Sequence, residues 1–315
     1  MSNEPTACWP GRERVNRLLL STVALIAALL GGVAPLHADT VETSANRDNI
    51  FKSGVLWQIS KPGMEPSYLM GTVHTDDPRI IAVGQRVLPL LASTTTLAVE
   101  VLLSSENSAY ASRAMFFTDG RHLRQVAGDK LFHASVAALK ARGMSEQHVA
   151  MMKPWAVFTV LSMPEMKTGQ FLDAMLYSKA QSEQKKLIGL ETMQEQIAVF
   201  DELTMAEQLV LLEDTLAQHG KMKQMIEGII ERYLAQDLVG MEKLNDDHMQ
   251  FTDAALAEKV NQRLLYQRNL VMFDRMQSLL KQGNVFVAVG VLHLTGERGL
   301  LNLLHKAGFE LTPVK

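Results

Sequence analysis

The sequence predicts an α/β protein built on a central mixed β-sheet that many helices flank. Short runs of β-branched and aliphatic residues cluster near both ends of the chain, and a long stretch of helical pattern lies between them. The chain has 315 residues, of which 47% are hydrophobic, and this share suffices for a sizeable core. A mainly disordered chain is therefore excluded. The net charge is -3, without a long basic block, so we expect no nucleic-acid partner.

A β-hairpin is the first predicted element. Residues 54–60 and 67–72 are short apolar runs, and the sequence KPGMEP between them has the Pro and Gly of a turn. A helical stretch follows from about residue 83 to 91. The sequence TTTLAVEVL, residues 94–102, is rich in β-branched residues and predicts a third strand.

The middle of the chain, about residues 105–282, has a largely helical pattern and could form a cap over the sheet. A brief strand candidate interrupts it at residues 186–190. The sequences TMQE at Thr192 and TMAE at Thr204 have the spacing of capping boxes, in which a threonine and a glutamate satisfy free backbone groups at a helix start. Two successive helices are therefore expected to begin there.

The C-terminal part returns to strands. Residues 284–289 (NVFVAV) predict a strand by residue type, residues 296–306 a helix, and residues 309–312 a final strand. No linker of low complexity divides residues 39–315, so we expect them to form a single domain.

Residues 1–38 have the order of a secretory signal peptide. Three arginines precede an uncharged run over residues 18–34, and Ala38 offers a small residue for cleavage. A periplasmic or secreted protein is therefore expected. The alternative is an uncleaved signal, the only route to a membrane that the sequence offers. The only cysteine, Cys8, lies in this segment, so the mature chain is expected to lack thiolate ligands, cysteine nucleophiles and disulfides.

Two tetrapeptides share the pattern GxxH. Gly71 begins GTVH, which ends at His74, and Gly290 begins GVLH, which ends at His293. Each follows a predicted strand, and strand ends often carry catalytic groups because a rigid sheet fixes the backbone there. Imidazole is both a common ligand of divalent metals and the usual acid or base near neutral pH. A single histidine after a strand is usually structural, so the repetition makes these two candidates.

Glu100 lies among apolar residues in LAVEV. A carboxylate on a buried strand is costly unless it is paired, protonated or bound to metal. It could instead face solvent from an edge strand. If it is buried, it could join His74 and His293 in a site for zinc, manganese or cobalt, with positions left open for water.

These residues resemble the TraB/GumN superfamily, which includes the animal Tiki proteins. The resemblance rests on GVLWQIS…SYLMGTVHTDDP, the VEV strand, LDAMLYSKA…KKLIGLETMQEQ, the pair Arg268-Asn269, and VFVAVGVLHLTGERGLLNLLHKAGFEL. It implies a fold related to erythromycin-esterase-like enzymes. For Tiki it implies metal-dependent hydrolysis of peptide bonds supported by manganese or cobalt. A peptide or protein is therefore the expected substrate.

The resemblance also assigns positions. It places His74, His293 and Glu100 at motif positions, Gly71 and Gly290 in support of them, and Asp173, Glu191 and Arg268 at other recurrent positions. In the resulting hypothesis Glu100 binds metal or accepts a proton, and Arg268 steadies a developing oxyanion. Asp173 and Arg268 could equally belong to surface ion pairs, and Glu191 could simply supply first-turn charge beside Thr192.

Other functions remain open at this stage. The sequence has no HExxH, GxSxG, P-loop or GxGxxG motif, so any hydrolase is of an unusual type. One alternative is a metal-independent, esterase-like hydrolase, and another is a non-catalytic protein that binds metal or haem. Met151, Met152, Met163 and Met166 could suggest copper(I), although methionines near Trp155 and Phe158 are typical of core packing.

Overall fold

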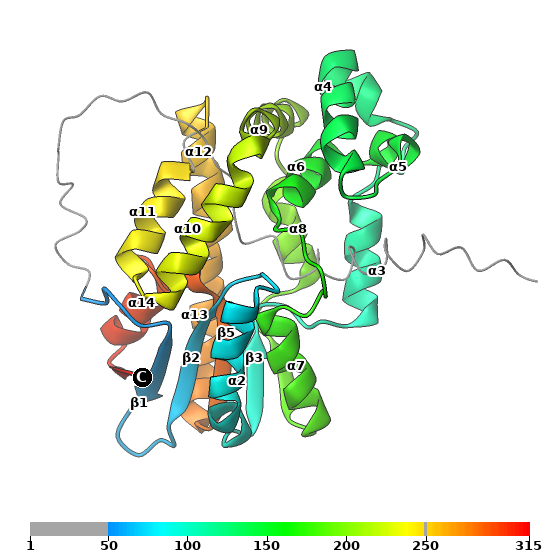
Figure 1. The fold of residues 1–315 in the computed structure, drawn as a ribbon. Coiled ribbons are helices and arrows are strands. Elements are labelled where there is room, and N and C mark those ends of the chain that lie inside the picture. Colours follow the sequence, from blue (N-terminus) through cyan, green and yellow to red (C-terminus); the bar gives the residue numbers. More distant parts are fainter. Residues whose placement is uncertain (1–49, 249–250) are drawn as a thin grey trace, which may run out of the picture.

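A computed structural model describes residues 50–248 and 251–315 (Figure 1). The predicted signal peptide lies outside these residues and stays a prediction. The strands are β1 (Leu56–Ser60), β2 (Ser67–Thr72), β3 (Thr96–Val99), β4 (Lys186–Gly189), β5 (Val285–Gly290) and β6 (Glu310–Pro313). The α-helices are α2 (Pro78–Ala92), α3 (Ser105–Ala114), α4 (Leu123–Lys140), α5 (Glu146–Met151), α6 (Pro154–Ser162), α7 (Leu172–Ser182), α8 (Met193–Asp201), α9 (Met205–Gln218), α10 (Met222–Leu234), α11 (Leu238–His248), α12 (Ala254–Asn261), α13 (Gln267–Gln282) and α14 (Leu300–Lys306). Short 3₁₀ turns η2 (His219–Lys221) and η4 (Val291–His293) and a π-helix η3 (Gln262–Tyr266) complete the elements.

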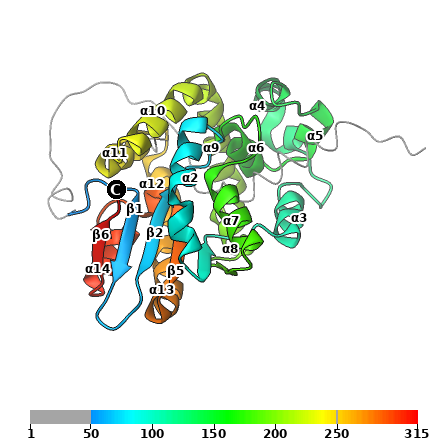
Figure 2. The ribbon, with the colours of Figure 1, turned by 60° about the horizontal axis from the view of Figure 1, so that its bottom comes forward.

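The predicted α/β class is confirmed. The six strands form one mixed sheet in the order β4-β3-β5-β2-β1-β6. β1 pairs antiparallel with β2, as the hairpin prediction requires, and with β6. β2, β5, β3 and β4 run parallel to one another. Helices α2 and α7 cover one face of the sheet, and α13 covers the other (Figures 1 and 2).

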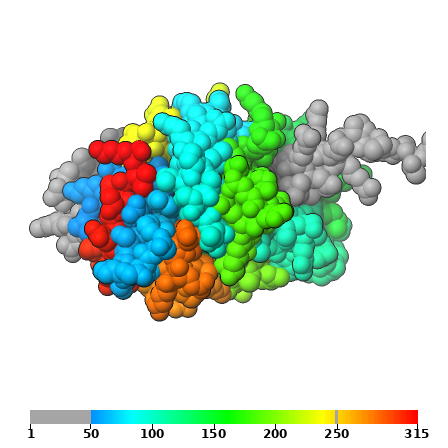
Figure 3. Space-filling model, turned by 90° about the horizontal axis from the view of Figure 1, so that it is seen from below, coloured from blue at the N-terminus to red at the C-terminus, as the bar shows by residue number. Residues whose placement is uncertain are grey.

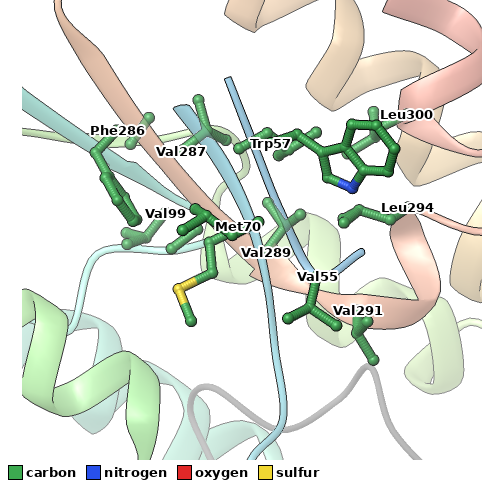
Figure 4. Packing of buried hydrophobic residues seen from close by; sticks show 14 of the residues in the cluster. Val55, Trp57, Met70, Val99, Phe286, Val287, Val289, Val291, Leu294 and Leu300 are labelled. Carbon is green, nitrogen blue, oxygen red and sulfur yellow. The ribbon is translucent and has the colours of Figure 1, made fainter. Parts of the chain in front are cut away.

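Apolar side chains form two separate cores. The larger one packs the sheet against its flanking helices, with Phe286, Met70 and Leu69 fully buried (Figure 4). The second lies among helices α3 to α6, α8, α9 and α12, which stand above the sheet in Figure 1 as the predicted helical cap. Met152 belongs to this second core. Fully burying one large apolar side chain contributes about 1.5–3 kcal/mol to stability. The first core therefore stabilises the sheet with its flanking helices, and the second stabilises the helical cap.

Local signals place the helix starts well. Thr192 and Thr204 both form complete capping boxes, with Glu195 and Glu207 as the returning side chains. Asp77 caps α2, which begins at Pro78, earlier than predicted. The predicted helix over residues 296–306 begins only at Leu300. Gly296 has a φ of +76°, a left-handed conformation that does not belong to a helix, and it lies in the turn between η4 and α14.

The third strand is shorter than predicted, and this moves Glu100. β3 ends at Val99, so Glu100 follows the strand instead of lying within it. β3 is also an inner strand between β4 and β5, which removes the alternative of an edge-strand glutamate facing solvent. The four parallel strands all end at the same edge of the sheet. Residues that follow them therefore meet there.

No helix among the described residues combines the length and the apolar character needed to cross a lipid bilayer.

Candidate active site at the carboxyl edge of the parallel strands

The pairing of β2 with β5 brings the two GxxH motifs together. In this parallel register Gly71 lies opposite Val289, and Thr72 lies opposite Gly290. A Cβ atom on Gly71 would stand 2.8 Å from Cγ2 and 2.9 Å from Cα of Val291. Because the backbone of Val291 cannot give way as a side chain does, only glycine allows this approach. The first glycine of one motif is therefore required by the close packing of the other.

His74 is held by a carboxylate. Its Nδ1 lies 2.9 Å from Oδ2 of Asp173, in the first turn of α7, and Thr72 donates from Oγ1 to Oδ1 of the same carboxylate at 2.6 Å. An ionised carboxylate only accepts, so Nδ1 carries the hydrogen. The buried Nε2 of His74 has no hydrogen-bond partner. Burial lowers the pKa of His74, but the charge and hydrogen bond of Asp173 outweigh it, so the pKa is raised overall.

His293, in η4, is held by an amide. Its Nδ1 lies 2.7 Å from Oδ1 of Asn269, on α13, and Nδ2 of Asn269 donates to the carbonyl of Arg298 at 2.9 Å. Because that carbonyl needs a donor, the amide orientation is fixed and Nδ1 of His293 carries the hydrogen. Nε2 is again buried without a partner. Burial lowers the pKa of His293 to about 3, so the ring is neutral at physiological pH.

Glu100 faces His293 and is bound from several sides. Its Oε1 accepts the backbone N–H of Gly290 at 2.6 Å and lies 3.7 Å from Nε2 of His293. Its Oε2 accepts from Arg268 at 2.6 Å and from Gln196 at 3.1 Å. Burial opposes ionisation, but chiefly the charge of Arg268, with the Gly290 hydrogen bond in support, lowers the pKa of Glu100 to about 2. This carboxylate is therefore ionised.

Arg268 joins two carboxylates. It lies on α13, and its Nε and Nη2 also bind Glu191, which follows β4. Its Nη1 donates to the carbonyl of Leu264 in η3. The backbone N–H of Glu191 donates to the carbonyl of Glu100 at 2.7 Å, so the loops after β3 and β4 are also linked directly. Burial and the charge of Glu100 raise the pKa of Glu191. The guanidinium thus holds Glu100 in place from behind.

The site is buried and rich in ionisable side chains. All six chemically active side chains that the sequence singled out lie in it, each at most 8% exposed: His74, Glu100, Asp173, Glu191, Arg268 and His293. Neither Asp173 nor Arg268 is on the surface, so the surface ion-pair alternatives are wrong. Three carboxyl groups and two imidazoles therefore share the site with one guanidinium.

The donor set fits a divalent metal in part. Nε2 of both histidines has no hydrogen-bond partner. Nδ1 of each is hydrogen-bonded to a carboxylate or amide oxygen. Histidines that bind a metal through one nitrogen usually have such a bond at the other. Within residues 50–248 and 251–315, however, no three His, Asp, Glu or Cys side chains are close enough together to hold an ion as they stand. Both imidazoles therefore present a free ligand atom, and Glu100 lies 3.7 Å from Nε2 of His293 with its oxygens already hydrogen-bonded.

The structure adds residues that motif reasoning did not assign. Asn269, Gln196, Thr72 and Tyr233 all bond to the site, the last through its hydroxyl to the carbonyl of Gly71 at 2.7 Å. The pair Arg268-Asn269 was visible in the sequence as part of the family resemblance. Thr72 and Gln196 also lie within segments that carry the resemblance, although nothing marked them as site residues. Tyr233 had no signal, since a buried tyrosine is ordinary core composition.

Comparisons with known proteins identify a family and several relatives. A family model described as the TraB/PrgY/gumN family matches residues 55–313. The protein YbaP of Shigella flexneri is 25% identical over 251 residues, covering 78% of this chain and 90% of YbaP. A protein named metalloprotease TIKI2 from Danio rerio is 23% identical and covers 90% of this chain, but the match spans 65% of TIKI2. No solved structure gave a significant match.

Proposed function

The chain belongs to the TraB/PrgY/gumN family, and on that premise we propose that it is a metal-dependent hydrolase of peptide bonds, acting at His74, His293 and Glu100. The observation that carries the proposal is the pair of buried, unpartnered Nε2 atoms, one of which, that of His293, lies 3.7 Å from the ionised Glu100. The resemblance to a protein named metalloprotease TIKI2 supports the choice of bond. The substrate is then a peptide or protein, still to be identified.

We propose manganese or cobalt as the ion, with zinc as a further candidate. His74 and His293 would hold it through Nε2, and Glu100 would complete the set with Oε1, whose second lone pair is not used by Gly290. The ion would act as a Lewis acid toward a carbonyl group and would lower the pKa of water.

The protein's own residues prepare this chemistry. Asp173 and Asn269 keep both Nδ1 atoms protonated, which leaves both Nε2 lone pairs free. Arg268 and Gln196 hold Oε2 of Glu100, so its other oxygen stays turned toward His293. Nearly all N–H groups of Arg268 are engaged, and we assign it to positioning Glu100 instead of binding an oxyanion.

The first experiment measures metal content. Mature protein is stripped with chelator, offered manganese, cobalt or zinc, and analysed by elemental mass spectrometry as wild type, His74→Ala and His293→Ala. His122→Ala is the control, because His122 is exposed and outside the site. We expect about one ion per chain in wild type and control, lost in both site variants. Wild type that folds by circular dichroism but binds no ion would overturn the metal proposal.

A second candidate follows from one contact. The Asp173–His74 pair is the arrangement of a general base oriented by a carboxylate, and Asp173 raises the pKa of His74 against the effect of burial. A metal-independent hydrolase is therefore the alternative enzyme. Cleavage of a peptide library that survives complete chelation would favour it. Bound metal without cleavage of any peptide would instead indicate a binding protein.

Location is also a proposal. The N-terminal pattern of arginines, apolar run and Ala38 supports export to the periplasm or beyond. Mass spectrometry of the exported protein, with Asp39 expected as its first residue, checks it.

A further inference from the structure

An apolar pocket lies away from the histidines, on the α2 face of the sheet. Its volume is about 210 Å³. One wall is a stripe of α2 side chains with helical spacing, Val83, Val87 and Leu90, and the floor includes Met70 of β2. Figure 3 shows the two outer walls at the surface, α2 in cyan and the C-terminal residues in red. A cavity of about 150 Å³ already admits benzene, so this one has room for a short alkyl chain.

The charged side chains that line the pocket are both cationic. Arg86, one turn along the α2 stripe, and Lys315 line it, and no acidic side chain does. Arg86 is exposed and forms no ion pair with any described residue. An apolar chamber with an unpaired guanidinium at its edge is complementary to a molecule that has an alkyl tail and a negative head group.

Tyr233 connects this pocket with the candidate active site. It is one of the lining residues, and its hydroxyl donates to the carbonyl of Gly71, the first residue of a GxxH motif. Neither His74 nor His293 lines the pocket. Its occupant would touch the side chain that supports the backbone leading to His74.

We infer that this pocket binds a single-chain alkyl carboxylate, a short fatty acid, with the tail between α2 and the sheet and the carboxylate on Arg86. The assignment does not depend on the proposed hydrolase activity. Burying the tail supplies the favourable free energy, and the guanidinium selects the sign of the head group.

Titration calorimetry of the whole mature chain with octanoate tests the inference. We expect saturable binding of one octanoate per chain. Octylamine, which has the same tail and the opposite charge, should bind at least tenfold more weakly, about 1.4 kcal/mol. Absence of saturable octanoate binding to the folded wild type would overturn the inference, and so would equal binding of octylamine.

Variants locate the site. Arg86→Ala should weaken octanoate binding about tenfold, whereas Arg113→Ala, an exposed arginine on α3, should not change it. Val83→Trp fills the chamber from the partly exposed face of α2 and should abolish binding, with an unchanged circular dichroism spectrum as the check on folding. Unchanged affinity in both Arg86→Ala and Val83→Trp would show that octanoate binds elsewhere and would contradict the assignment.

Discussion

Asn269 accepts the Nδ1 hydrogen of His293 through its amide oxygen, 2.7 Å away, while its NH₂ group is committed to the carbonyl of Arg298. This single side chain therefore decides which nitrogen of His293 is free. Asn269, on α13, therefore selects the neutral form of His293 that carries its hydrogen on Nδ1.

Substitution of Asn269 separates its two roles. Asn269→Leu leaves the Nδ1 hydrogen without an acceptor, so we expect a loss of about 1–3 kcal/mol in unfolding free energy and 10- to 100-fold in metal affinity. Asn269→Asp restores an acceptor for His293 but places a carboxylate oxygen against the Arg298 carbonyl. It should recover metal affinity but not stability. Metal titration and urea unfolding measure the two effects, and equal metal affinity in all three proteins would contradict this role.

Two arginines on α13 allow a matched comparison of buried and exposed ion pairs. Arg268 binds Glu100 and Glu191 inside the protein, whereas Arg275 binds Glu195 at the surface. Arg268→Ala leaves buried carboxylates without their partner, which should cost about 3–5 kcal/mol of unfolding free energy. Arg275→Ala should cost about 1 kcal/mol or less. Similar losses in urea denaturation of the two variants would show that the Arg268 cluster is not the buried network described.

The loop of residues 163–171 ends beside His74, and the rate at which trypsin cuts it is expected to measure how readily it detaches from the protein. It joins α6 to α7, and Phe171 at its end packs edge-on against the His74 ring. Asp76 accepts from both the backbone N–H and the hydroxyl of Thr168. Asp76→Ala removes both bonds, so trypsin should cut the native protein faster after the exposed Lys167.

Asp214→Ala is the control for that measurement, because Asp214 accepts the same two kinds of hydrogen bond from Thr252, far from this loop in the sequence. It should leave the rate of cleavage at Lys167 unchanged. An Asp76→Ala rate no greater than that of this control would mean that other contacts hold the loop.

Acid should selectively weaken the start of α8. Hydrogen bonds from Arg275 and from Thr192 outweigh the effect of burial and lower the pKa of Glu195 to about 2 from an ordinary 4.5. A lowered pKa means that the charged form stabilises the fold. This contribution is complete above the unfolded pKa of about 4.5 and is lost as the pH falls toward 2.

Glu195→Gln isolates this effect, because glutamine keeps the capping-box spacing without the charge. The difference in unfolding free energy between wild type and variant should be constant from pH 7 to about 5 and should shrink between pH 4.5 and 3. Urea titrations across that range measure it. A difference that grows on acidification would contradict the sign.

The strands and helix starts could be predicted from local sequence because their causes are local. The run VFVAV is β-branched and apolar, and the two TxxE sequences supply their own hydrogen-bond partners. The ends of β3 and the helix at Leu300 were missed by a few residues. Those ends depend on what the chain packs against, which a short window of sequence does not contain.

The site could be predicted only as a set of residue types. His74, His293 and Glu100 stood out because histidines after strands and an acid among valines are unusual. For Asp173 in LDAMLY and Arg268 in QRNLV, the sequence left a site role and a helix-surface ion pair equally open, and only the tertiary fold shows that they are buried partners. The register that sets Gly71 beside Val289 joins residues more than 200 positions apart, and no local pattern encodes such a pairing.

That long-range pairing has a consequence for biosynthesis. A ribosome makes His74 and Glu100 in the first third of the chain and Asp173 just past its middle, but the strand that completes the centre, β5, and the second histidine come near the end. Closing so large a loop is slow, and it follows the formation of local helices. The incomplete chain therefore has no assembled centre. If the protein cuts peptides, it can begin to do so only when its own folding is almost complete.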